Sequence, residues 1–196
     1  MGQPTLLVAG FGRSGTTMMM TMLDRGGFPC SGPRPAYEVE EMSPIPGIDT
    51  AWLAQQQGRA VKYIDPTQAR ISRNNFVAPP VIIHMDRDVV QMANSQAKLM
   101  ETLFGMKLGR QGRKALHRSL LNDKPTLAAI LASLGRVYSF TFGTALREPM
   151  RTAEKIATIL HDEFECNFDI GNAASVPIAR SPECAADMRI ELGMVV

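Results

Sequence analysis

Residues 6–23 read LLVAGFGRSGTTMMMTML. The apolar run at 6–9 predicts a buried strand of a parallel sheet, and the apolar stretch at 18–23 predicts a helix. Between them, residues 10–17 form a glycine-rich loop. Glycines let backbone N–H groups converge on an anion, and the start of the helix directs the positive end of its dipole to the same point. The stretch therefore predicts a phosphate-binding loop between a strand and a helix.

Three kinds of phosphate site fit this loop, and the first is a dinucleotide site. Gly10, Gly12 and Gly15 have the GxGxxG spacing, but such sites also need an acidic residue about 20 residues further on to bind the ribose. The sequence around Cys30, GGFPCSGPRP, has no carboxylate before Glu38. The dinucleotide interpretation is therefore disfavoured.

The second kind of site is that of P-loop kinases and NTPases. Gly10 and Gly15 fit the GxxxxGK[ST] pattern, in which the lysine contacts the β- and γ-phosphates and the hydroxyl binds magnesium. Thr16 stands at the lysine position. Arg13 supplies a cation from a different direction, within the loop. A metal-assisted kinase or NTPase is therefore an alternative that the loop disfavours.

The third kind of site rests on a resemblance. GRSGTT resembles the 5′-phosphosulfate loop of sulfotransferases that use 3′-phosphoadenosine-5′-phosphosulfate (PAPS). That loop has a Lys or Arg, a Ser or Thr, a Gly and two hydroxyl residues. The matching residues here are Arg13, Ser14, Gly15, Thr16 and Thr17. The resemblance implies that they bind the 5′-phosphosulfate together with Gly12.

A second signature of that family is an arginine at the end of a later strand, with a serine in the helix that follows; together they bind the 3′-phosphate of the nucleotide. Residues 81–96, VIIHMDRDVVQMANSQ, match it with Arg87 and, eight residues on, Ser95. The pattern itself predicts a buried strand at about 81–86 and a helix capped by Asp88. Ser95 then lies two turns into the helix, where a hydroxyl has no capping role. The two phosphate-binding signatures agree.

Length and composition indicate one globular domain over residues 1–196, with 45% hydrophobic and 20% charged residues. The resemblance covers about the first 100 residues well and residues 136–162 loosely. It implies an α/β fold of three layers, α/β/α, with a parallel sheet like that of P-loop nucleoside triphosphate hydrolases. Longer relatives carry a C-terminal RKG segment on the 3′-phosphate, and we find no equivalent at the matching place.

Further elements follow from the apolar pattern. Two short strands, at 60–64 and 137–142, are expected near the centre of the sheet. A helix is expected to begin at Asp123 and Pro125 and to end at a glycine, at about 123–135. A last clear helix begins at Pro149, and a loop-rich tail follows after about 165.

The cellular setting is predicted from what the sequence contains. No apolar run reaches the length of a membrane span and no signal-peptide pattern opens the chain, so we expect a cytoplasmic protein with no stable membrane insertion. Cys30, Cys166 and Cys184 are odd in number and lack metal-ligand spacing, which favours reduced thiols and no structural metal. A net charge of +2 is too small to indicate nucleic acid as a partner.

One segment is strongly basic. Residues 107–118, KLGRQGRKALHR, contain six basic side chains counting His117, and no acidic one. Such a segment can meet the anionic nucleotide or an acidic acceptor. Two glycines favour the other interpretation, a solvated connector between helices.

The catalytic residues are predicted from the needs of sulfonate transfer. Arg13 is expected to stabilise the charge that develops on the leaving phosphate, and the hydroxyls of Thr16 and Thr17 are expected to donate hydrogen bonds to it. Residues 32–42, GPRPAYEVEEM, resemble the stretch that follows the first helix in bacterial sulfotransferases that modify sugars. Glu38 matches the glutamate of that stretch best, and we expect it to be the base.

Other residues remain open as the base or as a contact of the sulfonate. Glu40 and Glu41 are rivals of Glu38 within the same acidic segment. Lys62 and Asp65 match a lysine-containing strand end that lies beside the donor in several relatives. Lys62 is expected to contact the sulfonate that is transferred. His84, on the strand at 81–86, is more typical of a packed histidine than of a base.

Together these features predict a sulfotransferase that transfers a sulfonate from PAPS, without a metal, to a hydroxyl or amine of a small-molecule or carbohydrate acceptor. The segments expected to contact the acceptor are 31–58 and 99–122, and no motif in them predicts which acceptor binds. The sequence does not predict the oligomeric state either. Two alternatives stay open: a P-loop kinase or NTPase, and a nucleotide-binding protein that keeps the fold without the chemistry.

Overall fold

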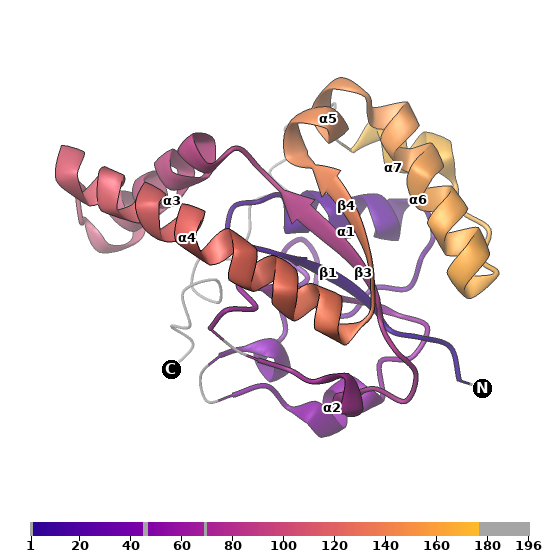
Figure 1. The fold of residues 1–196 in the computed structure, drawn as a ribbon. Coiled ribbons are helices and arrows are strands. Elements are labelled where there is room, and N and C mark those ends of the chain that lie inside the picture. Colours follow the sequence, from indigo (N-terminus) through magenta and orange to yellow (C-terminus); the bar gives the residue numbers. More distant parts are fainter. Residues whose placement is uncertain (1, 45–46, 69, 177–196) are drawn as a thin grey trace.

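A four-stranded, all-parallel sheet forms the centre of the protein (Figure 1). The computed structural model describes residues 2–44, 47–68 and 70–176. Along the sheet the strands stand in the order β2-β1-β3-β4. Their bounds are Leu6–Gly10 for β1, Ala60–Ile64 for β2, Val81–Asp86 for β3 and Arg136–Thr141 for β4. The predicted α/β class and its parallel sheet are confirmed.

The register brings the carboxyl ends of the strands to one edge of the sheet. Gly10 at the end of β1 pairs with Ile64 of β2, and Asp86 at the end of β3 pairs with Thr141 of β4. The loops that follow the strands therefore meet at this edge, where parallel sheets commonly bind ligands. The loop residues 12–15, Asp65 and Arg87 lie at this edge, and Thr16, Thr17 and Ser95 lie in the helices that follow. Lys62 and His84 lie within strands, and Glu38, Glu40 and Glu41 lie between α1 and α2.

Helices cover both faces of the sheet, which gives three layers. On one face lie α1 (Thr16–Arg25), α6 (Pro149–Phe164) and α7 (Ile170–Ser175). On the other face lie α2 (Thr50–Ala54), α3 (Val89–Phe104) and α4 (Arg110–Leu134). The short helix α5 (Phe142–Arg147) and the 3-10 turns η1 (Glu40–Met42) and η2 (Arg73–Asn75) complete the described elements.

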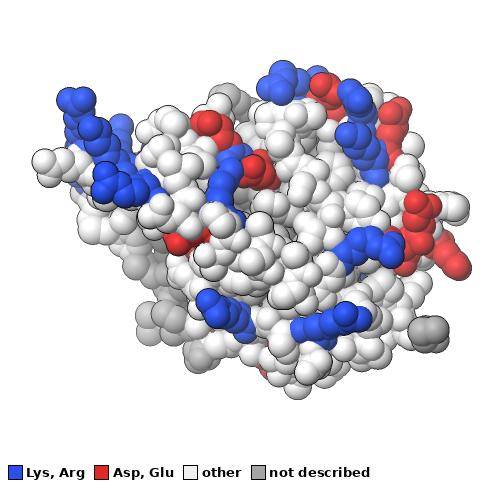
Figure 2. Space-filling model, viewed as in Figure 1, with Lys and Arg blue, Asp and Glu red and all other residues white. Residues whose placement is uncertain are grey.

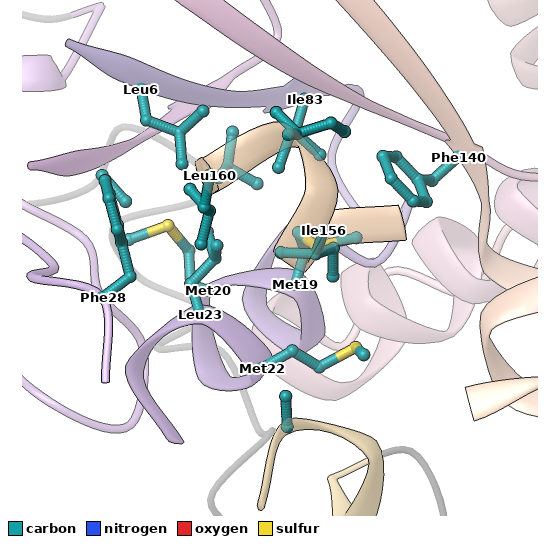
Figure 3. Close-up of a cluster of buried hydrophobic side chains, with 14 of the residues drawn as sticks. Leu6, Met19, Met20, Met22, Leu23, Phe28, Ile83, Phe140, Ile156 and Leu160 are labelled. Atoms are coloured by element: carbon teal, nitrogen blue, oxygen red, sulfur yellow. The ribbon is translucent and has the colours of Figure 1, made fainter. Parts of the chain in front are cut away.

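The alternation of side chains along β1 divides the core between the two faces. Leu6 and Val8 point to the first face, where the buried methionines of α1 meet Ile156 and Leu160 of α6 (Figure 3). Leu7 and Ala9 point to the second face and pack with α3 and α4. The apolar run at residues 6–9 is thus buried on both sides, as in other parallel sheets.

The two strands expected near the centre of the sheet are instead its outer strands. β2 is nevertheless buried. The segment after α1 contacts it through a β-bridge between Cys30 and Ala60 and through the bonds of Lys62 to Ala36 and Glu38. β4 is largely exposed. It ends one residue earlier than predicted, since Thr141 caps α5 by accepting a hydrogen bond from the backbone N–H of Thr144, 3.2 Å away.

The helix expected to begin at Asp123 and Pro125 begins much earlier, at Arg110, and runs through the proline. Proline breaks a helix because it lacks an N–H and crowds the preceding turn. Here burial outweighs that cost. One stripe of leucines packs on the sheet on both sides of the proline, namely Leu120, Leu127, Leu131 and Leu134.

The prediction of a connector at 107–118 holds for residues 107–109 and is wrong for residues 110–118, which are the first turns of α4. Only residues 105–109 separate α3 from α4. The pair forms a hairpin that projects from the body of the molecule, at the left of Figure 1.

Part of the expected loop-rich tail is a helix. Asp169 caps α7 by accepting a hydrogen bond from the backbone N–H of Asn172, 2.9 Å away, and its own N–H donates to the carbonyl of Gly26 at 2.9 Å. These bonds attach α7 to the end of α1. Residues 177–196, with Cys184, lie outside the described part of the chain.

None of the described helices combines the length and the apolar character that crossing a membrane requires.

Candidate functional site

The loop between β1 and α1 is shaped by its close approach to β3 and α5. Gly15 has φ +106°, and a Cβ there would lie 2.5 Å from a ring carbon of Phe142. At Gly10 a Cβ would lie 2.6 Å from the carbonyl oxygen of Met85. Arg13, in the middle of the loop, also has a positive φ, 71°. A Cβ does not fit at Gly10 or Gly15, so packing alone requires these two glycines.

Helix α1 begins directly after the loop. Gly15 is its N-cap and no side chain caps it, while Thr16 and Thr17 form its first turn, as predicted. The buried Ser14 hydroxyl has no hydrogen-bond partner among the described residues. Uncapped N–H groups at a helix start, together with buried hydroxyls, make a setting that favours an anion.

The two predicted phosphate-binding segments meet. The Nε of Arg13 donates a hydrogen bond to the Oγ of Ser95 at 3.2 Å, and the guanidinium of Arg87 donates to the carbonyl of Arg13 at 3.1 Å. The Nε2 of Gln96, beside Ser95, donates to the carbonyl of Gly12 at 2.9 Å. Asp88 caps α3, as predicted, by accepting from a backbone N–H at 2.9 Å. Residues more than 70 positions apart in sequence therefore form one site.

Arg87 is held between the loop and α5. Its guanidinium carbon lies 4.5 Å from the centre of the Phe142 ring, and its buried Nε has no hydrogen-bond partner among the described residues. Burial lowers the pKa of Arg87, the nearby charge of Arg13 lowers it further, and Asp88 opposes both effects. Two guanidinium groups thus repel each other here, and a bound anion would relieve that repulsion.

A buried ion pair lies on the other side of the loop. Lys62 on β2 and Glu38 have side chains that are 1% and 3% exposed, and they form a salt bridge. The Nζ of Lys62 also donates to the Oγ1 of Thr17 at 2.7 Å and to the carbonyl of Ala36 at 3.1 Å. An ammonium has three donors, so these contacts connect β2, the segment before η1 and the first turn of α1.

Of the five candidate bases, Glu38 and Asp65 line the pocket beside Gly12 and Arg13. Asp65, after β2, accepts hydrogen bonds from the side chains of the neighbouring residues 67 and 68 at 2.5 and 2.7 Å. Glu40 and Glu41 lie in η1 and do not line this pocket.

The fifth candidate base, His84, lies within β3 away from that pocket. Burial lowers its pKa, Asp86 opposes this effect and Lys124 adds to it. His84 therefore has the features of a packed, neutral histidine.

A second recess opens on the far side of Arg87. It is lined by Asp86 and Asp88, by Thr141 at the end of β4 and Gly143 in α5, and by the basic side chains of His117, Lys124 and Arg147. Lys124 forms an ion pair with Asp86 at 2.7 Å. One recess thus contains Arg13 and two candidate bases, and the other contains Arg87 and lies next to α4 and α5.

The structure adds residues to the site that the sequence did not single out. Gln96 holds the loop carbonyl of Gly12, and Phe142 supports Arg87 and packs on Gly15. Gln96 follows directly after Ser95 in the sequence, so the predicted helix could have indicated it. Nothing in the local sequence relates Phe142 to the loop, because only the pairing of β3 with β4 brings it there.

A comparison with protein-family models gives no match, and a comparison with curated proteins gives no significant match. Among the described residues, no group of three or more His, Cys, Asp or Glu side chains is placed to hold a metal ion. The assignment of a function therefore depends on the residues of the site.

Proposed function

We propose that this protein is a PAPS-dependent sulfotransferase with a P-loop-like domain, which transfers a sulfonate to a hydroxyl or amine of an acceptor. The observation that carries the proposal is the contact between the loop and the second segment, Arg13 Nε to Ser95 Oγ at 3.2 Å, with Arg87 bound to the Arg13 carbonyl at 3.1 Å. Two adjacent arginines on separate elements suit a ligand with two separate anionic groups better than a ligand with a single anionic group.

The surroundings of Thr17 favour this donor over a magnesium-bound triphosphate. Thr17 stands at the position whose hydroxyl binds magnesium in the GxxxxGK[ST] pattern. Here its Oγ1 accepts a hydrogen bond from the ammonium of Lys62 at 2.7 Å. The ammonium, whose charge is paired with Glu38, occupies the place beside this oxygen that a magnesium ion would take, so Thr17 is not available as a metal ligand while Lys62 holds this position. PAPS chemistry needs no metal, so the arrangement supports sulfonate transfer.

The proposed reaction takes place at the recess lined by Glu38 and Asp65. The acceptor oxygen or nitrogen attacks sulfur from the recess lined by Glu38 and Asp65, and the bond between sulfur and the 5′-phosphate oxygen breaks. Arg13 and the loop N–H groups stabilise the charge that develops on that oxygen. The acceptor proton passes to a carboxylate, Glu38 or Asp65, and 3′-phosphoadenosine-5′-phosphate leaves.

Within this proposal Lys62 is a positioning residue. Its ammonium donates to Thr17, to the carbonyl of Ala36 and to Glu38, so it fixes the orientation of the candidate base relative to the loop. The acceptor lies over this edge, and we propose a small molecule or a carbohydrate. We further propose that the protein acts in the cytoplasm, where the free thiols of Cys30 and Cys166 stay reduced.

Calorimetric titration with 3′-phosphoadenosine-5′-phosphate tests the proposal. Saturable binding without magnesium is expected, and Arg13→Ala and Arg87→Ala should each weaken it by about tenfold or more, because each removes a charge-assisted hydrogen bond. Arg151→Ala, an exposed arginine on α6, is the control and should bind normally.

Binding of ATP with magnesium, but not of the bisphosphate, would instead favour the kinase or NTPase alternative. Binding of the bisphosphate without consumption of PAPS over a panel of hydroxyl and amine acceptors would favour the non-catalytic alternative.

A further inference from the structure

The hairpin of α3 and α4 is basic at its projecting end. Figure 2 shows Lys and Arg side chains gathered there, at the left of the view. Lys107, Arg110, Arg113 and Lys114 are exposed, and His117 is half-buried. The turn and the first two turns of α4 carry these side chains at spacings of three and four residues, which place them on one face of the helix.

These side chains line a single cavity between α3 and α4, with a volume of about 660 Å³. Its remaining lining includes the apolar side chains of Val90, Ala93 and Leu108, and no acidic side chain of the described residues lines it. The cavity is therefore an apolar recess with a rim of positive charge.

Little in the described part of the chain neutralises that rim. Lys107 approaches Glu101 at 4.0 Å, and the Nε of Arg113 donates to the carbonyl of Leu108 at 3.1 Å. Arg110, Arg113 and Lys114 form no ion pair with a described carboxylate. In addition α4 begins here, at Gly109, without a side-chain cap, so its dipole adds to the positive potential.

The cavity adjoins the proposed active site. Val90 and His117 line both this cavity and the recess that contains Arg87. The opposite side of α3 faces the pocket with the candidate bases, where Leu99 and Met100 form part of the wall. Helix α3 thus separates the cavity from the recess where the acceptor is proposed to attack sulfur, so only a long, chain-like ligand that passes around α3 can occupy both.

We infer that this cavity binds an acidic polysaccharide and so holds the acceptor of the proposed reaction; the inference rests on the proposed function. A carboxylate-bearing polysaccharide supplies anions for the rim, C–H faces for the apolar floor, and the hydroxyl groups that the reaction needs. Nucleic acid fits less well, because no Phe, Tyr or Trp of the described residues lines the cavity to stack on bases. A membrane surface is a poor partner for a recess.

Binding of alginate, a polymer of uronic acids, to the full chain tests the inference, with uncharged dextran as the reference ligand. Arg110→Ala/Lys114→Ala removes two charges four residues apart on α4. Its matched control is Arg151→Ala/Lys155→Ala, which removes an Arg and a Lys with the same spacing from the exposed side of α6. Circular dichroism and thermal midpoints establish that both variants fold.

We expect alginate to bind, dextran not to bind, and added salt to weaken the binding. The α4 variant should lose at least about tenfold in affinity, while the α6 variant keeps it. Equal losses in the two variants would overturn the inference, since they would reflect net charge alone. Tighter binding of duplex DNA or of phosphatidylserine vesicles than of alginate, lost in the α4 variant, would overturn the assigned ligand.

The same α4 variant separates this inference from the proposed function. It should bind 3′-phosphoadenosine-5′-phosphate as the unsubstituted chain does, because Arg13, Arg87 and Ser95 are intact. If the unsubstituted chain binds alginate at the hairpin but not the bisphosphate, the proposed function fails and the polysaccharide site stands. If it binds the bisphosphate but not alginate, the polysaccharide site fails alone.

Discussion

At the scale of single residues, the most consequential pair is Lys62 and Glu38. Both side chains are almost fully buried, so each charge depends on the other for its stabilisation. Removing one partner of such a pair leaves an uncompensated buried charge, whereas replacing both with apolar residues is often nearly neutral.

Lys62→Met should therefore destabilise the fold by about 3–5 kcal/mol, and the added substitution Glu38→Leu should recover about half of that loss or more. Urea unfolding of the three proteins measures this. If the double variant is as unstable as Lys62→Met, the contacts of Lys62 with Thr17 and Ala36 stabilise the fold more than the ion pair does.

His84 gives the protein a dependence of stability on pH. Burial is the main cause of its lowered pKa, from an ordinary value of 6.5, with Lys124 adding to the effect and Asp86 opposing it. As the pH falls below that value, the unfolded chain binds a proton that the folded chain resists, so the folded state loses stability.

Between about pH 7 and pH 5, the free energy of unfolding should thus fall more steeply in the natural protein than in His84→Gln. Urea unfolding at several pH values provides the comparison. Parallel curves for the two proteins would contradict a neutral, packed imidazole at this position.

At the scale of elements, α4 carries a cost that its packing offsets. Pro125 lies inside the helix and removes one backbone hydrogen bond, while the leucine stripe on both sides of it stays buried. Pro125→Ala restores an N–H donor and removes the steric conflict, so it should stabilise the protein by about 1–3 kcal/mol. Differential scanning calorimetry, which measures the midpoint of thermal unfolding, tests this prediction. A lower midpoint would mean that a bend at the proline is needed for the packing of α4.

Local sequence patterns predict some elements well because those elements are fixed by neighbours in the chain. The strand, loop and helix of residues 6–23 and the strand before Arg87 follow from apolar runs, glycines and the capping residue Asp88. The positions of β2 and β4 at the edges of the sheet do not, because strand order depends on contacts between distant segments. For the same reason, the continuity of α4 through Pro125 is set by the sheet beneath it.

The same contrast holds within the site. Arg13, Arg87 and Ser95 were identified from their motifs, and the structure places them together. The support of Arg87 by Phe142 and the burial of Lys62 on an outer strand depend on tertiary packing, which no motif encodes.

At the scale of the whole molecule, the sheet joins two crossover units into one site. The β1–α1 unit supplies the loop and the β3–α3 unit supplies Arg87 and Ser95, and the pairing of β1 with β3 fixes their distance. The hairpin of α3 and α4 extends one of these units away from the sheet. We propose that the donor binds at the sheet edge and the acceptor at the elements around it.

We propose that Arg87 binds a second phosphate, separate from the one bound in the loop. The decisive comparison is the affinity of adenosine 3′,5′-bisphosphate and of adenosine 5′-monophosphate for the natural protein and for Arg87→Ala. Arg87→Ala should weaken the bisphosphate by about tenfold to a hundredfold and leave the monophosphate nearly unchanged. An equal loss for both ligands would contradict the claim, because Arg87 would then act on the loop and not on a second phosphate.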